Sequence, residues 1–174
     1  YESLLGKSPL KKKIIKGTDI SIYRELTGGI YFGEKKISAD GNTASDLCEY
    51  SRYEIERITH LAFKAAKSRR HKVTLIDKAN VLESSRLWRK VVGEISKDYP
   101  EIELDYLFVD NAAMQMILNP NQFDVILTEN LFGDVISGCY YGSDGLRSPF
   151  TVTRDPGTPE YQGEVDPDST VYNN

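Results

Sequence analysis

The sequence predicts an α/β fold, a largely parallel sheet flanked by helices, followed by an irregular C-terminal tail. Short apolar runs alternate along the chain with longer segments whose apolar residues recur at helical spacing. Strands that alternate with helices imply βαβ units, and such units build parallel sheets. The pattern stops at Gly138, because residues 138–174 hold five glycines and four prolines and no helical stripe. We therefore expect loops in the tail, with a short hairpin at most around Phe150 to Thr153.

Length and composition limit the class of protein. The 174 residues suffice for one well-buried domain, and 40% apolar and 28% charged residues are typical of a soluble globular protein. The net charge of -4 and the lack of a broad basic surface argue against a nucleic-acid partner. No apolar run approaches the roughly 20 residues of a membrane span. Cys48 and Cys139 match no metal, redox or disulfide spacing, so we expect a reducing cytoplasm.

The N-terminal part is organised around a glycine turn. The apolar run Ile20 to Tyr23 is expected to form a strand, and Gly28-Gly29 permits a turn with positive φ before a second short strand over Ile30 to Phe32. Arg24 and Tyr31 flank this reversal and can face one cleft. A guanidinium can bind a carboxylate through two hydrogen bonds, and a nearby tyrosine can transfer a proton. The alternative is an ordinary β-hairpin with a surface ion pair.

A polar segment and two long helices follow. Glu34 to Ser45 is expected to be loop-like, with a turn at residues 40–42. The helix over Arg52 to Arg69 is predicted by apolar residues at i, i+3 and i+7, and the helix over Ser85 to Lys97 by a similar stripe that stops before Pro100. Between them, the apolar run Val73 to Ile76 predicts a buried strand that ends at Asp77-Lys78.

Two further strand–helix pairs complete the predicted domain. Leu104 to Val109 is a strand that ends at Asp110, and a short helix spans Ala112 to Leu118. Phe123 to Leu127 is the next strand, and it leads into a turn of helix that carries Asp134. In parallel sheets, ligands bind outside the carboxyl ends of the strands. Lys78, Asp110 and Asp134 all lie at or just beyond such ends, so they can meet in one cleft.

These three side chains suit metal-assisted chemistry on a hydroxy acid. Two aspartates make a hard oxygen site for Mg2+ or Mn2+, which would lower the pKa of a substrate hydroxyl, and Lys78 would be a general base. Each has a structural alternative. Asp110 could be a helix N-cap, Asp134 a first-turn acid favoured by the helix dipole, and Lys78 a surface cation. His60 and His71 have no partner at ligand spacing.

Several motifs resemble one enzyme family in unbroken order over about residues 8–137. Arg24-Glu25-Leu26-Thr27-Gly28-Gly29-Ile30-Tyr31-Phe32-Gly33 resembles the signature of the β-decarboxylating hydroxyacid dehydrogenases, and its Leu-Thr-Gly-Gly filling favours the 3-isopropylmalate branch over the isocitrate and tartrate branches. The further matching motifs are Asp77-Lys78-Ala79-Asn80-Val81-Leu82, Trp88-Arg89-Lys90, Val109-Asp110-Asn111-Ala112-Ala113-Met114, Phe123-Asp124-Val125-Ile126 and Thr128-Glu129-Asn130-Leu131-Phe132-Gly133-Asp134-Val135-Ile136-Ser137.

The resemblance implies NAD-dependent oxidative decarboxylation of 3-isopropylmalate in leucine biosynthesis. Arg24 would bind a substrate carboxylate, and Tyr31 would handle the proton added after decarboxylation. Lys78 would take the hydroxyl proton, and Asn80 would lie near the nicotinamide of NAD. Asp110 and Asp134 would bind Mg2+ or Mn2+.

The resemblance also implies a homodimer with shared active sites. Lys78 and Asp110 would serve the neighbouring subunit's cleft, and residues near Gly33 to Asp46 would form part of a projecting, interlocking arm. We expect residues 1–137 to be a substrate-binding and dimerisation domain and residues 138–174 to be an unrelated tail. Gly138-Cys139-Tyr140-Tyr141 stands where the family usually has a further aspartate.

The sequence leaves alternatives to the complete enzyme. It lacks an initiating Met and the family's N-terminal and C-terminal parts, so we expect it to begin inside a longer protein. One alternative is a non-catalytic dimerising fragment that keeps the fold. The other is a related β-decarboxylating dehydrogenase that acts on another 2-hydroxy acid.

Overall fold

The computed structural model describes residues 12–138 and 151–153. Its elements are, in order, α1 (Lys12–Ile15), β1 (Ser21–Arg24), β2 (Lys35–Ile37), β3 (Ala44–Asp46), α2 (Arg52–Lys67), β4 (Lys72–Asp77), α3 (Glu83–Ile95), η2 (Ser96–Asp98), β5 (Glu103–Phe108), α4 (Val109–Leu118), η3 (Pro120–Gln122), β6 (Val125–Thr128), α5 (Asn130–Gly138) and β7 (Thr151–Thr153). Among these residues, no helix has the length and apolar character needed to cross a lipid bilayer.

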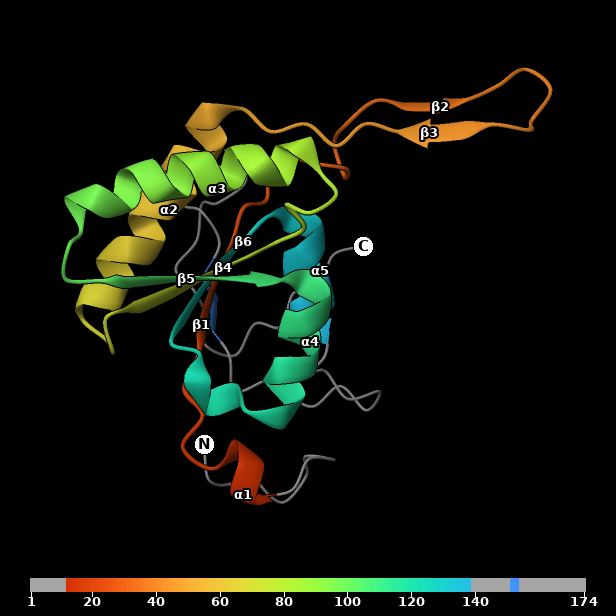
Figure 1. Ribbon diagram of the computed structural model, residues 1–174. Coiled ribbons are helices and arrows are strands. Elements are labelled where there is room, and N and C mark those ends of the chain that lie inside the picture. Colours follow the sequence, from red (N-terminus) through yellow and green to blue (C-terminus); the bar gives the residue numbers. More distant parts are fainter. Residues whose placement is uncertain (1–11, 139–150, 154–174) are drawn as a thin grey trace, which may run out of the picture.

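The main sheet is parallel, with strand order β5-β4-β6-β1-β7. The side chains of the inner strands alternate between two apolar cores, because successive residues of a strand point to opposite faces. Val125 and Leu127 of β6 pack with α2 and α3, whereas Ile126 packs with α4 and α5. Figure 1 shows the two pairs of helices on opposite sides of the strands. The predicted α/β fold with a parallel sheet is confirmed.

The two long helices lie close to their predicted ranges. Ser51 begins α2 with a capping box, in which its hydroxyl accepts from the backbone of Glu54 and the Glu54 carboxylate accepts from the backbone of Ser51. Helix α3 brings Trp88, Val91 and Val92 into the apolar core that it shares with α2. There the rings of Trp88 and Tyr50 meet edge to face, with their centroids 5.5 Å apart. Apolar side chains at helical spacing therefore predicted these two elements well.

The predicted hairpin around the glycine turn is wrong. Residues 30–32 form no strand, because the amides of Phe32 and Gly33 both donate to the carbonyl of Gly29 and make a turn of helical character. Gly29 has a φ of 80°, as the turn requires. Strand β1 pairs with β6 and β7 instead, so its partners are distant in sequence.

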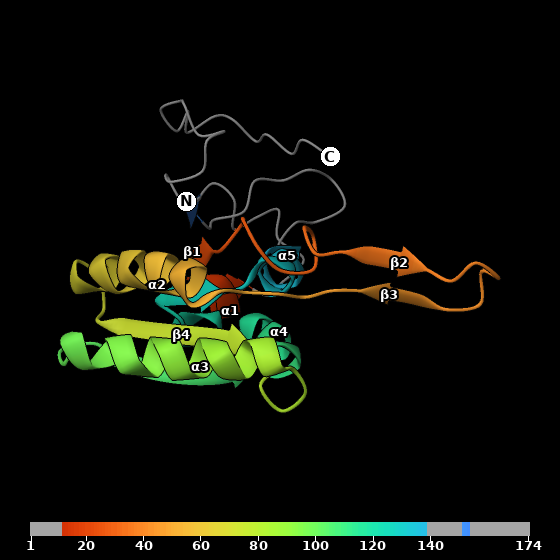
Figure 2. The same cartoon turned by 90° about the horizontal axis from the view of Figure 1, so that it is seen from above.

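The projecting arm that the family resemblance implied near Gly33 to Asp46 is present, but it is two-stranded and not loop-like as the polar sequence of Glu34 to Ser45 had indicated. Strands β2 and β3 pair antiparallel from Lys35–Asp46 to Ile37–Ala44, around a turn in which the Gly41 amide donates to Ser38. All six strand residues are exposed, which explains why the sequence shows no alternation of apolar and polar residues. Figures 1 and 2 show this arm extending away from the sheet and helices in both views.

Two smaller expectations also change. Helix α4 starts at Val109, directly after β5, so Asp110 lies within its first turn and is not the N-cap. Thr151–Thr153, expected in loops or a hairpin, pairs parallel with β1 as a strand of the main sheet. Cys139 and the other tail residues, apart from 138 and 151–153, lie outside the described residues. The proposed boundary between residues 137 and 138 stays a prediction.

Candidate active site

Strand β1 delivers Arg24 to the carboxyl end of the sheet, opposite Thr128 of β6. Helix α5 begins at Asn130, two residues after Thr128. The side-chain oxygen Oδ1 of Asn130 accepts from Arg24 Nε at 3.0 Å and from Arg24 NH2 at 2.8 Å. Asp134, one turn further along α5, accepts from Arg24 NH1 through Oδ1 at 2.9 Å. The guanidinium is therefore held by an amide and a carboxylate of one helix.

Tyr31 meets the same carboxylate from the glycine turn. Its hydroxyl donates to Oδ2 of Asp134 at 3.2 Å, and the Arg24 guanidinium lies 5.9 Å from its ring centroid. Partial burial and the nearby charge of Asp134 raise the pKa of Tyr31, so the phenol keeps its proton at neutral pH. We call Arg24, Tyr31, Asn130 and Asp134 the arginine cluster.

Lys78 and Asp110 form a second group, the lysine pair. Lys78 follows β4, Asp110 follows β5, and the Lys78 Nζ lies 2.5 Å from Asp110 Oδ1. The hydrogen bond from the Lys78 ammonium lowers the pKa of Asp110. The buried carboxylate of Asp77 shapes the turn, because it accepts from the backbone of Ala79 and from the Arg89 guanidinium. Asn80 is exposed in the same turn.

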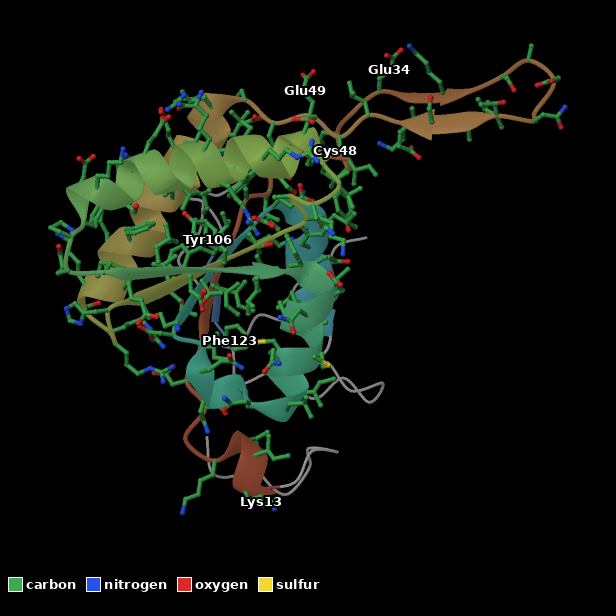
Figure 3. The ribbon with its side chains drawn as sticks, viewed as in Figure 1. Lys13, Glu34, Cys48, Glu49, Tyr106 and Phe123 are labelled. Carbon is green, nitrogen blue, oxygen red and sulfur yellow. The ribbon has the colours of Figure 1, made fainter. Side chains whose placement is uncertain are left out.

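The structure brings the predicted residues together in two groups and not in one. In the ranges 12–138 and 151–153, no hydrogen bond or ion pair joins the lysine pair to the arginine cluster. Strand β6 lies between β4 and β1 in the sheet, although all three end at the same edge. Figure 3 shows which way β6 runs relative to the arm. Phe123, just before β6, lies far from the arm, whereas Cys48 lies at the arm's base.

The two aspartates predicted to bind a metal ion lie in different groups, Asp134 in the arginine cluster and Asp110 in the lysine pair. Carboxylate oxygens suit Mg2+ or Mn2+, but Asp134 faces Arg24 and Asp110 faces Lys78. Nowhere in the described part of the chain do three His, Cys, Asp or Glu side chains gather at metal-binding distance. In one copy, each of the two predicted metal-binding carboxylates is thus paired with a basic side chain.

Sequence reasoning missed the residues that support the arginine cluster. Glu25 is fully buried and accepts from the backbone amides of Thr27 and Gly28 and from Arg57 NH2 at 3.0 Å, which ties the glycine turn to α2. Asn130 is 3% exposed, and its backbone amide donates to the Tyr50 hydroxyl at 3.0 Å. The one feature of the sequence that could have indicated Glu25 and Asn130 is that each lies shortly after a predicted strand.

A second buried acid lies beside Asn130. Glu129 is 3% exposed, and burial raises its pKa to about 7. Its carboxylate lies 3.9 Å from the Cys48 thiol, whose own pKa is raised by burial and by Glu129. An open pocket of about 250 Å³ lies nearby between the glycine turn and Glu49, but none of the predicted site residues lines it.

A family model described as isocitrate/isopropylmalate dehydrogenase matches residues 1–146 of the 174. The chain belongs to this family. The 3-isopropylmalate dehydrogenase of Clostridium acetobutylicum is 58% identical over 140 residues, which are 79% of this chain and 39% of that protein. That of Pseudoalteromonas translucida is 61% identical over 138 residues, 78% of this chain and 38% of that protein.

Solved structures agree with the family. The crystal structure of isocitrate dehydrogenase from Methylococcus capsulatus is 41% identical, with a TM-score of 0.65 over 68% of this chain and 36% of that one. The predicted resemblance to the isocitrate/isopropylmalate dehydrogenase family is thus confirmed. The chain spans less than half the length of the relatives that it matches.

Proposed function

We propose that this chain supplies substrate-binding, proton-transferring and metal-binding residues of an NAD-dependent 3-isopropylmalate dehydrogenase. The observation that carries the proposal is the arginine cluster, in which a guanidinium, a phenol and a carboxylate touch at the carboxyl end of a parallel sheet. Relatives that are 58–61% identical and named 3-isopropylmalate dehydrogenase support this substrate. Oxidation of 3-isopropylmalate, followed by release of CO2, would place the reaction in leucine biosynthesis.

Arg24 and Tyr31 would act on the carboxylate side of the substrate. The Arg24 guanidinium would bind a substrate carboxylate through charge-assisted hydrogen bonds. After the C–C bond to CO2 breaks, the electron pair remains on the substrate as an enolate, and carbon needs a proton. Tyr31 keeps its proton at neutral pH and lies beside Arg24, so it would supply that proton.

The lysine pair would act on the hydroxyl of a second copy's substrate. Lys78 would take the hydroxyl proton as a neutral amine, and the carboxylate of Asp110, whose Oδ1 lies 2.5 Å from Nζ, would stabilise the ammonium that forms. The separation of the two groups within one chain supports a homodimer, in which Lys78 and Asp110 of one copy would face Arg24, Tyr31 and Asp134 of the other. The exposed β2–β3 arm is a surface suited to such a pairing.

A divalent ion and NAD would supply the remaining chemistry. Asp134 of one copy and Asp110 of the second would hold Mg2+ or Mn2+, which stabilises negative charge on the substrate oxygen, and NAD+ accepts the hydride. Asn80, exposed beside Lys78, would lie near the nicotinamide. The free thiol of Cys48 suits a reducing compartment, and we propose the cytoplasm.

Two other functions have specific observations in their favour. The 41% identity to an isocitrate dehydrogenase favours another 2-hydroxy acid as substrate, although the relatives named for 3-isopropylmalate are more similar. The second is a dimerising fragment without turnover, and the exposed β2–β3 arm, a surface suited to pairing, is the observation in its favour.

Formation of NADH tests the proposal against both. The purified chain would be assayed at high concentration with Mn2+ and NAD+, on 3-isopropylmalate and on isocitrate, with its dimer measured by light scattering. We expect turnover on 3-isopropylmalate that Lys78→Ala abolishes and that Lys90→Ala, at an exposed position of α3, leaves unchanged. Turnover on isocitrate alone would indicate the other substrate. A dimer without turnover would indicate the fragment.

A further inference from the structure

Asn130 occupies one edge of the Arg24 guanidinium. A guanidinium has five N–H donors, and Asn130 Oδ1 accepts from Nε at 3.0 Å and from NH2 at 2.8 Å. These two donors form the side-on edge, the fork that would otherwise bind a carboxylate with two parallel bonds. A third donor, on NH1, contacts Asp134. The remaining donors belong to the terminal nitrogens NH1 and NH2.

The backbone of Asn130 is held from the side of the glycine turn. Asn130 is the first residue of α5, where a backbone amide has no partner within the helix, and the Tyr50 hydroxyl accepts from this backbone N–H at 3.0 Å. Tyr50 in turn packs against the glycine turn, since a Cβ on Gly28 would lie 2.9 Å from its ring. The backbone from which the Asn130 side chain reaches Arg24 is therefore fixed in a buried frame that also carries the glycine turn.

The neutrality of Asn130 matters for a dianionic substrate. Within the described residues, Asp134 is the acid that forms an ion pair with Arg24. Because Asp134 already balances the single charge of the guanidinium, a second carboxylate on the side-on edge would make the group net negative and repel the substrate, whereas an amide oxygen satisfies the same donors without negative charge.

We infer that Asn130 is a positioning residue for substrate binding, which fills the side-on edge of Arg24 with a neutral oxygen and leaves the terminal nitrogens to the substrate carboxylate. This inference rests on the proposed function, because it assigns that carboxylate to Arg24. It adds a requirement on charge that a purely structural hydrogen bond would not have. A structural bond would be kept, or strengthened, by an aspartate at this position.

Two variants and one control test the inference in the 174-residue chain. Asn130→Asp keeps the acceptor and adds a charge, Asn130→Ala removes the acceptor, and Asn119→Asp adds the same charge at an exposed position after α4. The first measurement is hydrogen exchange of the Arg24 Nε–H by NMR. The second is the affinity for 3-isopropylmalate with Mn2+, by isothermal titration calorimetry.

We expect slow exchange of the Nε–H in the unsubstituted chain and in Asn130→Asp, and fast exchange in Asn130→Ala. We expect Asn130→Asp to weaken 3-isopropylmalate binding by about tenfold or more, because like charges then meet at the binding edge, while Asn119→Asp stays within about twofold. Unchanged affinity of Asn130→Asp, or slow exchange in Asn130→Ala, would overturn the inference. If the unsubstituted chain binds no 3-isopropylmalate, the proposed function fails, and the exchange result still decides whether Asn130 positions Arg24.

Discussion

The Nζ of Lys78 lies 2.5 Å from Oδ1 of Asp110, although the two residues come from the ends of different strands. Strands β4 and β5 are paired in register, Asp77 with Phe108, so the residues just after them meet at the edge of the sheet. The contact places the proposed base and one proposed metal ligand together. It also leaves Asp134, the other proposed ligand, with Arg24 and Tyr31.

The substitution Asp110→Asn should weaken Mn2+ binding without lowering the stability of the fold. The Asp110 side chain is 67% exposed, so Asp110→Asn should leave the thermal unfolding midpoint close to that of the unsubstituted chain. Loss of the carboxylate should weaken Mn2+ binding in the presence of 3-isopropylmalate by about tenfold or more, measured by electron paramagnetic resonance. Asp98→Asn, at an exposed position of η2, is the control. Equal Mn2+ affinity in both variants would contradict the assignment of Asp110.

Gly133 should tolerate no side chain, because Arg24 passes over it. A Cβ there would lie 2.6 Å from Cγ and Cδ of Arg24 and 3.1 Å from Cγ2 of Thr128. Overpacking of this kind costs about 1–3 kcal/mol, which outweighs the gain of about 1 kcal/mol from alanine in a helix. Gly133→Ala should therefore lower the free energy of unfolding in urea. Gly138→Ala, with open space at the end of the same helix, should not, and similar values for both would refute the packing argument.

Glu25 should contribute more to stability than a surface acid. It is fully buried, ion-paired with Arg57 and bonded to two backbone amides of the glycine turn. Removing one partner of a buried pair costs about 3 kcal/mol, so Glu25→Ala should lower the free energy of unfolding by that amount in urea titrations. Glu56→Ala breaks a half-exposed pair with Arg52 and should cost less than about 1 kcal/mol. Equal losses would mean that the buried network is not stabilising.

Glu129 should make stability fall as pH rises. Burial raises its folded pKa to about 7, above its usual range, so between about pH 5 and 7 the folded chain holds a proton that the unfolded chain has lost. The folded state binds more protons in this window, and raising the pH through it lowers the free energy of unfolding. Glu129→Gln should remove this part of the pH dependence, measured by urea unfolding at pH 5 and 8. Glu101→Gln is the control, since Lys67 lowers the pKa of that exposed carboxyl. A decline that persists unchanged in Glu129→Gln would contradict the prediction.

Sequence patterns predicted the helices with one buried face and the strands with two. Helices α2 and α3 follow from apolar residues at helical spacing, and β4 and β6 from short apolar runs. The placement of Lys78 and Asp110 at the same sheet edge follows from the same reasoning, since parallel strands end together. Local periodicity was sufficient for these features.

Long-range pairing was beyond the reach of local signals. The glycine turn between two apolar runs predicted a hairpin, but Ser21 pairs with Val125 and Thr151 instead. The arm strands carry polar residues on both faces, so no alternation marks them. The hydrogen bonds of Glu25 and Asn130 are made with residues distant in sequence, Arg57 of α2 and Arg24 of β1, and residue type at those positions gave no sign of them.

Complementation between two variants tests the central claim most directly, that one copy's arginine cluster and a second copy's lysine pair make one site. Arg24→Ala and Lys78→Ala would be studied separately and after co-refolding in equal amounts, with NADH formation from 3-isopropylmalate in the presence of Mn2+ as the readout. We predict that neither variant turns over alone and that the mixture regains about a quarter of the unsubstituted chain's activity, because half of the dimers are mixed and each has one intact site. A mixture that turns over no faster than the separate variants would contradict a site shared between copies.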